Sequence, residues 1–148
     1  MSTITDTTTT TDTATTTDTN DATTTNGVTS DTFVVVLSRG LDDERATVAW
    51  TLANAGIASG QEVTVFLVSS GVDLARRGAV DRVQMNPNDP SMKDLVDKFL
   101  ANGGKVWACP PCAALRGYDE DSFIDGVEIV GAGPLHDLLK AGASTITF

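Results

Sequence analysis

The sequence predicts an α/β domain built as a three-layer α/β/α structure around a parallel sheet of about five strands. Continuous β-branched runs such as 33–37 are typical of strands that are covered on both faces. Segments with helical spacing alternate with these runs, and the loops between them are short. Such alternation favours a parallel sheet with helices on both of its faces.

The first two strands and the helix between them are clearly marked. The strand over 33–37 is followed by a glycine, and the three acids at 42–44 favour the first turn of a helix through its dipole. Apolar residues at helical spacing extend this helix to about residue 57. A second strand covers 62–68, and a short helix around 73–77 is expected after it.

The second half of the domain continues the alternation. Ser91 caps a helix that runs to about residue 101, where two glycines follow. A short strand over 105–108 leads directly into Cys109. The remaining expected elements are a helix over 113–116, a turn or short helix over 118–123, a strand over 127–130, a helix that Pro134 opens and that runs to about 141, and a strand over 143–148.

The first thirty residues differ from the rest in composition. Residues 1–30 contain sixteen threonines and four aspartates but no lysine or arginine. Such a segment lacks the apolar surface that offsets the entropy of folding, so we expect a disordered Thr/Asp-rich tail. Residues 31–148 are then expected to form one domain.

Charge and hydropathy exclude several classes of partner. The formal net charge is −10, and an acidic surface argues against nucleic acid and anionic membranes as partners. The N-terminus has neither the basic nor the apolar region of a signal peptide, and no run approaches the ~20 apolar residues of a membrane span. We therefore expect a cytoplasmic protein, where two nearby cysteines favour redox or metal chemistry over a structural disulfide.

Binding sites in parallel sheets form outside the carboxyl ends of the strands. Four loops are expected at that edge, and they are rich in Gly, Ser and Cys. Tight turns also explain such glycines, and without a G-x-G-x-x-G or G-K-[ST] motif we expect no nucleotide or other cofactor. Outside the cysteine loop, the candidate substrate- or anion-binding residues are Ser38, Ser70, Gly71, Gly131 and Gly133.

The two cysteines of the chain stand in the motif Cys109-Pro110-Pro111-Cys112. Cys109 ends a predicted strand and Cys112 lies at the start of a helix, where backbone N–H groups stabilise a thiolate. A lowered pKa at one cysteine would provide a nucleophile, which the other cysteine could resolve as a disulfide. The alternative is a pair of small buried side chains that do not react.

Three chemical classes use such cysteines. A thioredoxin-like exchanger shares the C-x-x-C motif, but most of that fold follows the motif, whereas only the last quarter of this chain follows Cys112. A zinc site takes four ligands, so two cysteines and one histidine would need ligands from another subunit, and we expect no metal within one chain. A persulfide carrier needs only one reactive cysteine on an accessible loop.

Two further side chains are candidates for the same chemistry. Arg116 lies one turn beyond Cys112, where it could stabilise a thiolate or bind an anionic sulfur species, or simply form a surface salt bridge. His136, the only histidine, follows a loop at the same sheet edge and could act as a base, although a surface helix position explains it more simply.

The segment around the cysteines resembles the DsrE family of sulfur-relay proteins, which includes the TusD-like and DsrEF-like sulfur carriers. The similar elements are the strand that ends in Cys109, the small-residue helix after it, Arg116-Gly117, Gly40-Leu41-Asp42 and Ser70-Gly71-Val72. The resemblance covers 33–148 and implies that Cys109 accepts sulfur, that the chain forms trimers or hexamers, and that a sulfur donor or acceptor protein is a partner. The relay members do not generally carry a cysteine at the position of Cys112, so a dithiol–disulfide role remains an alternative.

Three hypotheses follow from the sequence. The first is a persulfide carrier or sulfurtransferase-like protein with Cys109 as the nucleophile. The second is a dithiol–disulfide redox protein or sensor that uses Cys109 and Cys112. The third is a non-catalytic oligomeric module that binds a ligand or a metal.

Overall fold

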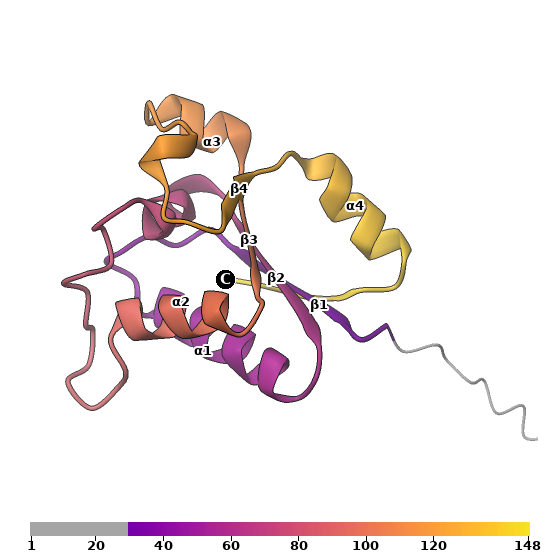
Figure 1. The fold of residues 1–148 in the computed structure, drawn as a ribbon, viewed down its shortest axis with the longest axis horizontal. Coiled ribbons are helices and arrows are strands. Elements are labelled where there is room, and N and C mark those ends of the chain that lie inside the picture. The colour runs from indigo at the N-terminus through magenta and orange to yellow at the C-terminus, as the bar shows by residue number, and fades with distance from the viewer. Residues whose placement is uncertain (1–29) are drawn as a thin grey trace, which may run out of the picture.

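The structure is a computed structural model that describes residues 30–148, so nearly all of the expected tail over 1–30 lies outside the described residues. Five parallel strands form one sheet in the order β4-β3-β2-β1-β5 (Figure 1). This confirms the predicted fold class. The strands are β1 (Thr32–Leu37), β2 (Glu62–Leu67), β3 (Lys105–Ala108), β4 (Val127–Ile129) and β5 (Ser144–Thr147).

Helices cover both faces of the sheet. Figure 1 shows α1 and α2 on one side of the strands and α4 on the other, as the strand–helix alternation predicts. The α-helices are α1 (Glu44–Ala58), α2 (Met92–Ala101), α3 (Pro110–Leu115) and α4 (Ala132–Lys140), and the 3₁₀-helices are η1 (Ser69–Ala75) and η2 (Glu120–Ser122). Among residues 30–148, no helix is long and apolar enough to cross a bilayer.

Three helices differ in extent from the sequence expectation. α4 begins at Ala132, so Pro134 is its third residue and does not open it. α3 begins at Pro110 instead of residue 113, because the first turn of a helix tolerates proline, whose missing N–H has no partner there to lose. The helix expected around 73–77 is η1, which begins directly after β2. It ends before Arg76, since that residue has an extended backbone and forms an antiparallel bridge with Phe123.

The main core lies between the sheet and the layer of α1 and α2. Val35, Val65 and Val106 point into it together, because paired residues of in-register parallel strands share a face. Trp50 of α1 packs edge-on against Phe99 of α2, with ring centroids 5.4 Å apart. Both rings are fully buried, so this layer is closed within one chain.

The opposite face of the sheet is less completely covered. Val36, Phe66 and Trp107 lie side by side on it, and of these three only Phe66 is buried. α4 crosses this face but contributes no buried residue. A single copy of the chain therefore leaves this layer only partly closed.

Candidate functional site

The cysteine loop lies at the carboxyl end of β3, beside the end of β2. The two strands pair in register up to Leu67 and Ala108, and the Cys109 N–H donates to the Leu67 carbonyl at 2.9 Å. Cys109 is thereby the N-cap residue of α3, and Cys112 lies in the first turn. Both thiols are free and half-buried. The strand end and the helix start thus hold both cysteines at the sheet edge expected for a site.

Cys112 has a specific hydrogen-bond partner. Its Sγ lies 3.1 Å from the backbone nitrogen of Ser69, whose N–H donates to the sulfur. Ser69 is the first residue of η1, so this contact joins the loop after β2 to the loop after β3. Because the donor is a backbone group, its position is fixed by η1 and not by a side-chain rotamer.

The electrostatic environment of Cys109 is different. Burial raises the pKa of the Cys109 thiol and the interaction with the Cys112 thiol raises it further, whereas the Cys112 backbone N–H opposes the shift. This direction is opposite to the lowered pKa expected of a nucleophile at a helix start, because the loss of solvation outweighs the N–H donor. Cys109 is therefore a thiol at neutral pH, and its reactions need a proton acceptor.

Arg116 belongs to a polar cluster with Asp73 and Tyr118. Its Nε lies 3.2 Å from Asp73 Oδ1, and its Nη1 donates to the Cys112 carbonyl at 3.2 Å. The Tyr118 hydroxyl donates to the same Asp73 oxygen at 3.0 Å. Burial raises the pKa of Tyr118, and the hydrogen bond to Asp73 adds to the rise. Arg116 thus holds the backbone of Cys112, and its charge is paired with Asp73.

The candidates on and before α4 lie outside this cluster. His136 is exposed on α4, and the groups that set the pKa of Cys109 do not include it. Gly131 is the N-cap of α4, and a Cβ on Gly131 or Gly133 would meet no atom within 4 Å. Within one copy, these residues have no contact that ties them to the thiols. Over residues 30–148, no group of three or more His, Cys, Asp or Glu side chains could hold a metal ion.

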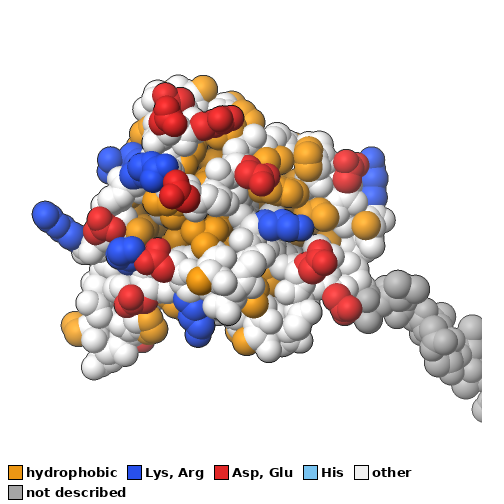
Figure 2. Space-filling view, in the orientation of Figure 1, with side chains coloured by type: hydrophobic (Ala, Val, Ile, Leu, Met, Phe, Trp, Pro, Cys, Tyr) orange, Lys and Arg blue, Asp and Glu red, His pale blue; other side chains and the backbone are white. Residues whose placement is uncertain are grey.

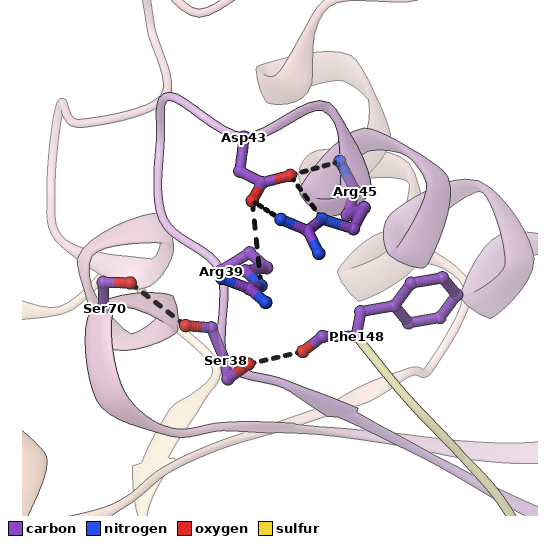
Figure 3. A network of polar contacts seen from close by, with 6 residues as sticks. All are labelled: Ser38, Arg39, Asp43, Arg45, Ser70 and Phe148. Atoms are coloured by element: carbon purple, nitrogen blue, oxygen red, sulfur yellow. Dashed lines mark hydrogen bonds and ion pairs between the residues drawn. The ribbon is translucent and has the colours of Figure 1, made fainter.

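Ser38, Ser70 and Gly71 form a packed corner between β1 and η1 (Figure 3). Ser38 Oγ donates to the Phe148 carbonyl at 2.6 Å, and Ser70 Oγ donates to the Ser38 carbonyl at 3.0 Å. A Cβ on Gly71 would lie 2.2 Å from the Leu37 carbonyl oxygen. Both hydroxyls are therefore engaged with backbone, and Gly71 is what allows η1 to approach β1 so closely.

The start of α1 carries a charged cap beside this corner (Figure 3). Asp43 is the N-cap residue and accepts from the Arg45 backbone N–H at 3.0 Å and from Arg45 Nε at 2.9 Å. Its other oxygen accepts from Arg45 Nη2 at 2.7 Å and lies 3.7 Å from Arg39 Nε. The side-chain and backbone hydrogen bonds with Arg45 lower the pKa of Asp43 from 3.8 to about 2. This network stabilises the helix start.

Ser69, Asp73 and Tyr118 were not among the residues expected at the site. Their positions follow from the order of the strands, which places η1 beside α3. The sequence signal for these positions was the serine pair that follows β2. Consecutive strands are often neighbours in a sheet, so the loop after β2 could be expected beside the loop after β3. The positive φ of Ser69, whose N–H reaches the sulfur, has no signature in a serine.

Several known proteins are similar to this chain. An uncharacterized protein of Methanopyrus kandleri is 35% identical over 112 residues, which cover 74% of this chain and 85% of that protein. An uncharacterized protein of Methanocaldococcus jannaschii is 28% identical over 116 residues, or 78% of this chain and 96% of the relative. Another protein of that organism is 31% identical over 69% of this chain, which spans only 37% of the relative's length.

Two solved structures and one family model also match this chain. The ychN protein of E. coli has a TM-score of 0.64 and 24% identity, covering 79% of this chain and 99% of that one. A protein of unknown function from Methanobacterium thermoautotrophicum has a TM-score of 0.54 and 22% identity, covering 78% of this chain and 99% of that one. These likenesses show the shared fold. The DsrE/DsrF-like family model matches residues 31–148, so the chain belongs to the DsrE/DsrF-like family.

Proposed function

We propose that the protein is a cysteine-based sulfur carrier, or sulfurtransferase-like protein, in which Cys109 accepts sulfane sulfur as a persulfide. The observation that carries the proposal is the position of Cys109. It lies half-buried after the end of β3, and its thiol interacts with the thiol of Cys112. Family membership supports a sulfur-relay role for this cysteine. Because burial keeps Cys109 protonated at neutral pH, its proton passes to the thiol that leaves the persulfide donor.

Mass spectrometry after incubation with a low-molecular-weight persulfide tests this proposal. We expect the Cys112→Ser variant to gain the mass of a single sulfur atom on Cys109, because no neighbouring thiol remains to remove it. The matched Cys109→Ser variant keeps the other thiol and should gain none. If Cys112→Ser gains no sulfur, or gains it in equal amount after Cys109 is also replaced, the proposal is wrong.

A dithiol–disulfide role is the second candidate, and the interaction between the two thiols favours it. Cys109 is the N-cap residue and Cys112 the third residue of α3, and their side chains interact, so a small adjustment would allow a disulfide. A cytoplasmic location fits either role, because thiols there are kept reduced between reactions. Titration in glutathione redox buffers tests the second role, and a pair that stays reduced under oxidising buffer would eliminate it.

We also propose that the protein is a homo-oligomer, with a second copy covering the face of α4. Leu135, Leu138 and Leu139 are only half-buried there, as is Trp107, and Figure 2 shows hydrophobic side chains at the surface beside α4. A trimer or hexamer is the assembly that the family resemblance implies. Light scattering of Leu138→Asp should show dissociation, whereas Leu115→Asp, at a leucine that is 84% exposed on α3, should not.

A further inference from the structure

The hydrogen bond to Cys112 comes from an unusual stretch of backbone. Among the residues that the structure describes, Ser69 is the only non-glycine residue with positive φ, at 51°. L-residues seldom adopt this left-handed conformation, because Cβ approaches the carbonyl oxygen. Here it occurs where the Ser69 N–H reaches the Cys112 sulfur at 3.1 Å. An unfavourable conformation kept at a thiol indicates a functional contact.

Cys112 is also fixed through its backbone. Its carbonyl accepts a hydrogen bond from Arg116 Nη1 at 3.2 Å, and Arg116 is paired through Nε with Asp73 at 3.2 Å. Asp73 lies in η1, the same short helix that begins with Ser69. η1 therefore holds Cys112 at two points, by its sulfur and, through Asp73 and Arg116, by its carbonyl.

The two thiols are consequently not equivalent. The Ser69 N–H is a donor that a negatively charged sulfur accepts from more strongly than a neutral one. Cys109 has the Cys112 side chain against it, and burial together with that neighbour keeps its proton in place. A sulfur atom added to Cys109 replaces the thiol proton on its Sγ and lies beside Cys112.

We propose that Cys112, held by the Ser69 N–H, is the resolving cysteine of the site and discharges sulfur accepted by Cys109 as sulfide. This activity rests on the proposed function, because it begins from a persulfide on Cys109. It adds the fate of the sulfur: reduction and release instead of transfer to an acceptor protein.

Two exchange steps complete the reaction. In the first, Cys109 Sγ attacks the terminal sulfur of a low-molecular-weight persulfide, the S–S bond of the donor breaks, and the donor leaves as a thiol that takes up the Cys109 proton. In the second, the Cys112 thiolate attacks Cys109 Sγ, the bond to the terminal sulfur breaks, and hydrosulfide leaves as the disulfide forms. The two cysteine sulfurs are oxidised and the sulfane sulfur is reduced. A low-molecular-weight thiol then reduces the disulfide for the next turnover.

A single-turnover experiment with glutathione persulfide and reduced protein tests the proposal. We expect the wild type to release about one sulfide per chain and to gain a Cys109–Cys112 disulfide. Cys112→Ser should keep the persulfide and release no sulfide, and Cys109→Ser should do neither. A wild type that keeps a stable persulfide without releasing sulfide would overturn this inference and leave the sulfur-carrier proposal intact. Failure of Cys112→Ser to gain sulfur would overturn both.

A second variant separates the positioning of Cys112 from its presence. Asp73→Asn weakens the link between η1 and Arg116, so we expect persulfide loading as in the wild type but sulfide release slower by about tenfold or more. Asp125→Asn is the matched control, because Asp125 is 94% exposed and, within residues 30–148, forms an ion pair only with Arg77. Equal rates of sulfide release in the two variants would show that η1 does not position Cys112.

Discussion

Replacing Gly71 by alanine measures how closely η1 must approach β1. A Cβ at this position would lie 2.2 Å from the Leu37 carbonyl oxygen and 3.1 Å from its carbonyl carbon. Favourable contacts between carbon atoms lie at about 3.5–4.0 Å, so η1 must move away by about 1 Å to accept the methyl group. Overpacking of a buried position costs about 1–3 kcal/mol of unfolding free energy, and a clash with backbone favours the upper part of that range.

Urea unfolding followed by the fluorescence of Trp50 and Trp107 measures this change, and Trp50 is buried in the core. In thermal unfolding of a domain of this size, we expect the melting temperature to fall by roughly 3–5 °C for each kcal/mol of unfolding free energy that is lost. Gly133→Ala is the control, since its Cβ meets no atom within 4 Å. Alanine is favoured over glycine in a helix by about 0.5–1 kcal/mol, whereas a Cβ directly before Pro134 disfavours the helical backbone, so that variant should stay close to the wild type in stability.

We expect Gly71→Ala to change the surroundings of the Cys112 thiol as well. Ser69 begins the turn that Gly71 belongs to, so displacement of η1 lengthens the contact between the Ser69 N–H and the Cys112 sulfur. We expect Gly71→Ala to slow any reaction in which Cys112 attacks, while Gly133→Ala leaves it unchanged. A Gly71→Ala protein with wild-type stability and wild-type thiol chemistry would refute the close-packing argument.

Three further predictions concern single groups. Asp43 has a folded-state pKa of about 2 against an ordinary 3.8, so its contribution to stability is present above pH 4 and is lost as the pH falls toward 2; NMR titration should find Asp43 returned toward 3.8 in Arg45→Gln, and a wild-type value of 3.8 would contradict the network. Tyr118 is the only tyrosine, so absorbance titration should give a phenol pKa above 10 that falls in Asp73→Asn, though burial keeps part of the rise; an unchanged midpoint would count against the hydrogen bond. Trp50 Nε1 is buried with no hydrogen-bond partner among the described residues, so Trp50→Phe should cost less than about 1 kcal/mol, because removing an unsatisfied donor offsets the smaller ring. Trp50→Ala should cost about 3–5 kcal/mol, and equal losses in urea unfolding would rule this out.

Hydrophobic periodicity and glycine placement were enough to predict the sheet and its helices. The β-branched run of β1 and the capping Ser91 of α2 define those elements locally, because their signals lie within a few residues. The extent of η1 was not predictable in the same way. It ends where Arg76 pairs with Phe123, a residue far along the chain, and no local pattern reports that pairing.

Part of the site was likewise predictable from nearby residues in the sequence, and part depends on contacts made only in the fold. Cys109, Cys112 and Arg116 share one short segment, so the sequence alone puts them together. The Ser69 N–H and the Asp73 carboxylate come from a different loop and contribute through backbone conformation and strand order. The raised pKa of Cys109 likewise depends on burial in the folded protein, and a motif that suggests an activated thiol contains no information about desolvation.

The pairing of β1 with β5 has a consequence for how the protein folds. Phe33 stands opposite Ser144, and the hydrogen bond from Ser38 to Phe148 closes a separation of 110 residues. Closing so long a loop is entropically unfavourable until the intervening elements have formed, so this edge of the sheet is the last to be completed. During synthesis, β1 therefore waits with one row of backbone groups unpaired while the rest of the chain emerges. We expect this unpaired edge of β1 to be the part of the sheet most prone to pairing with another chain before β5 forms.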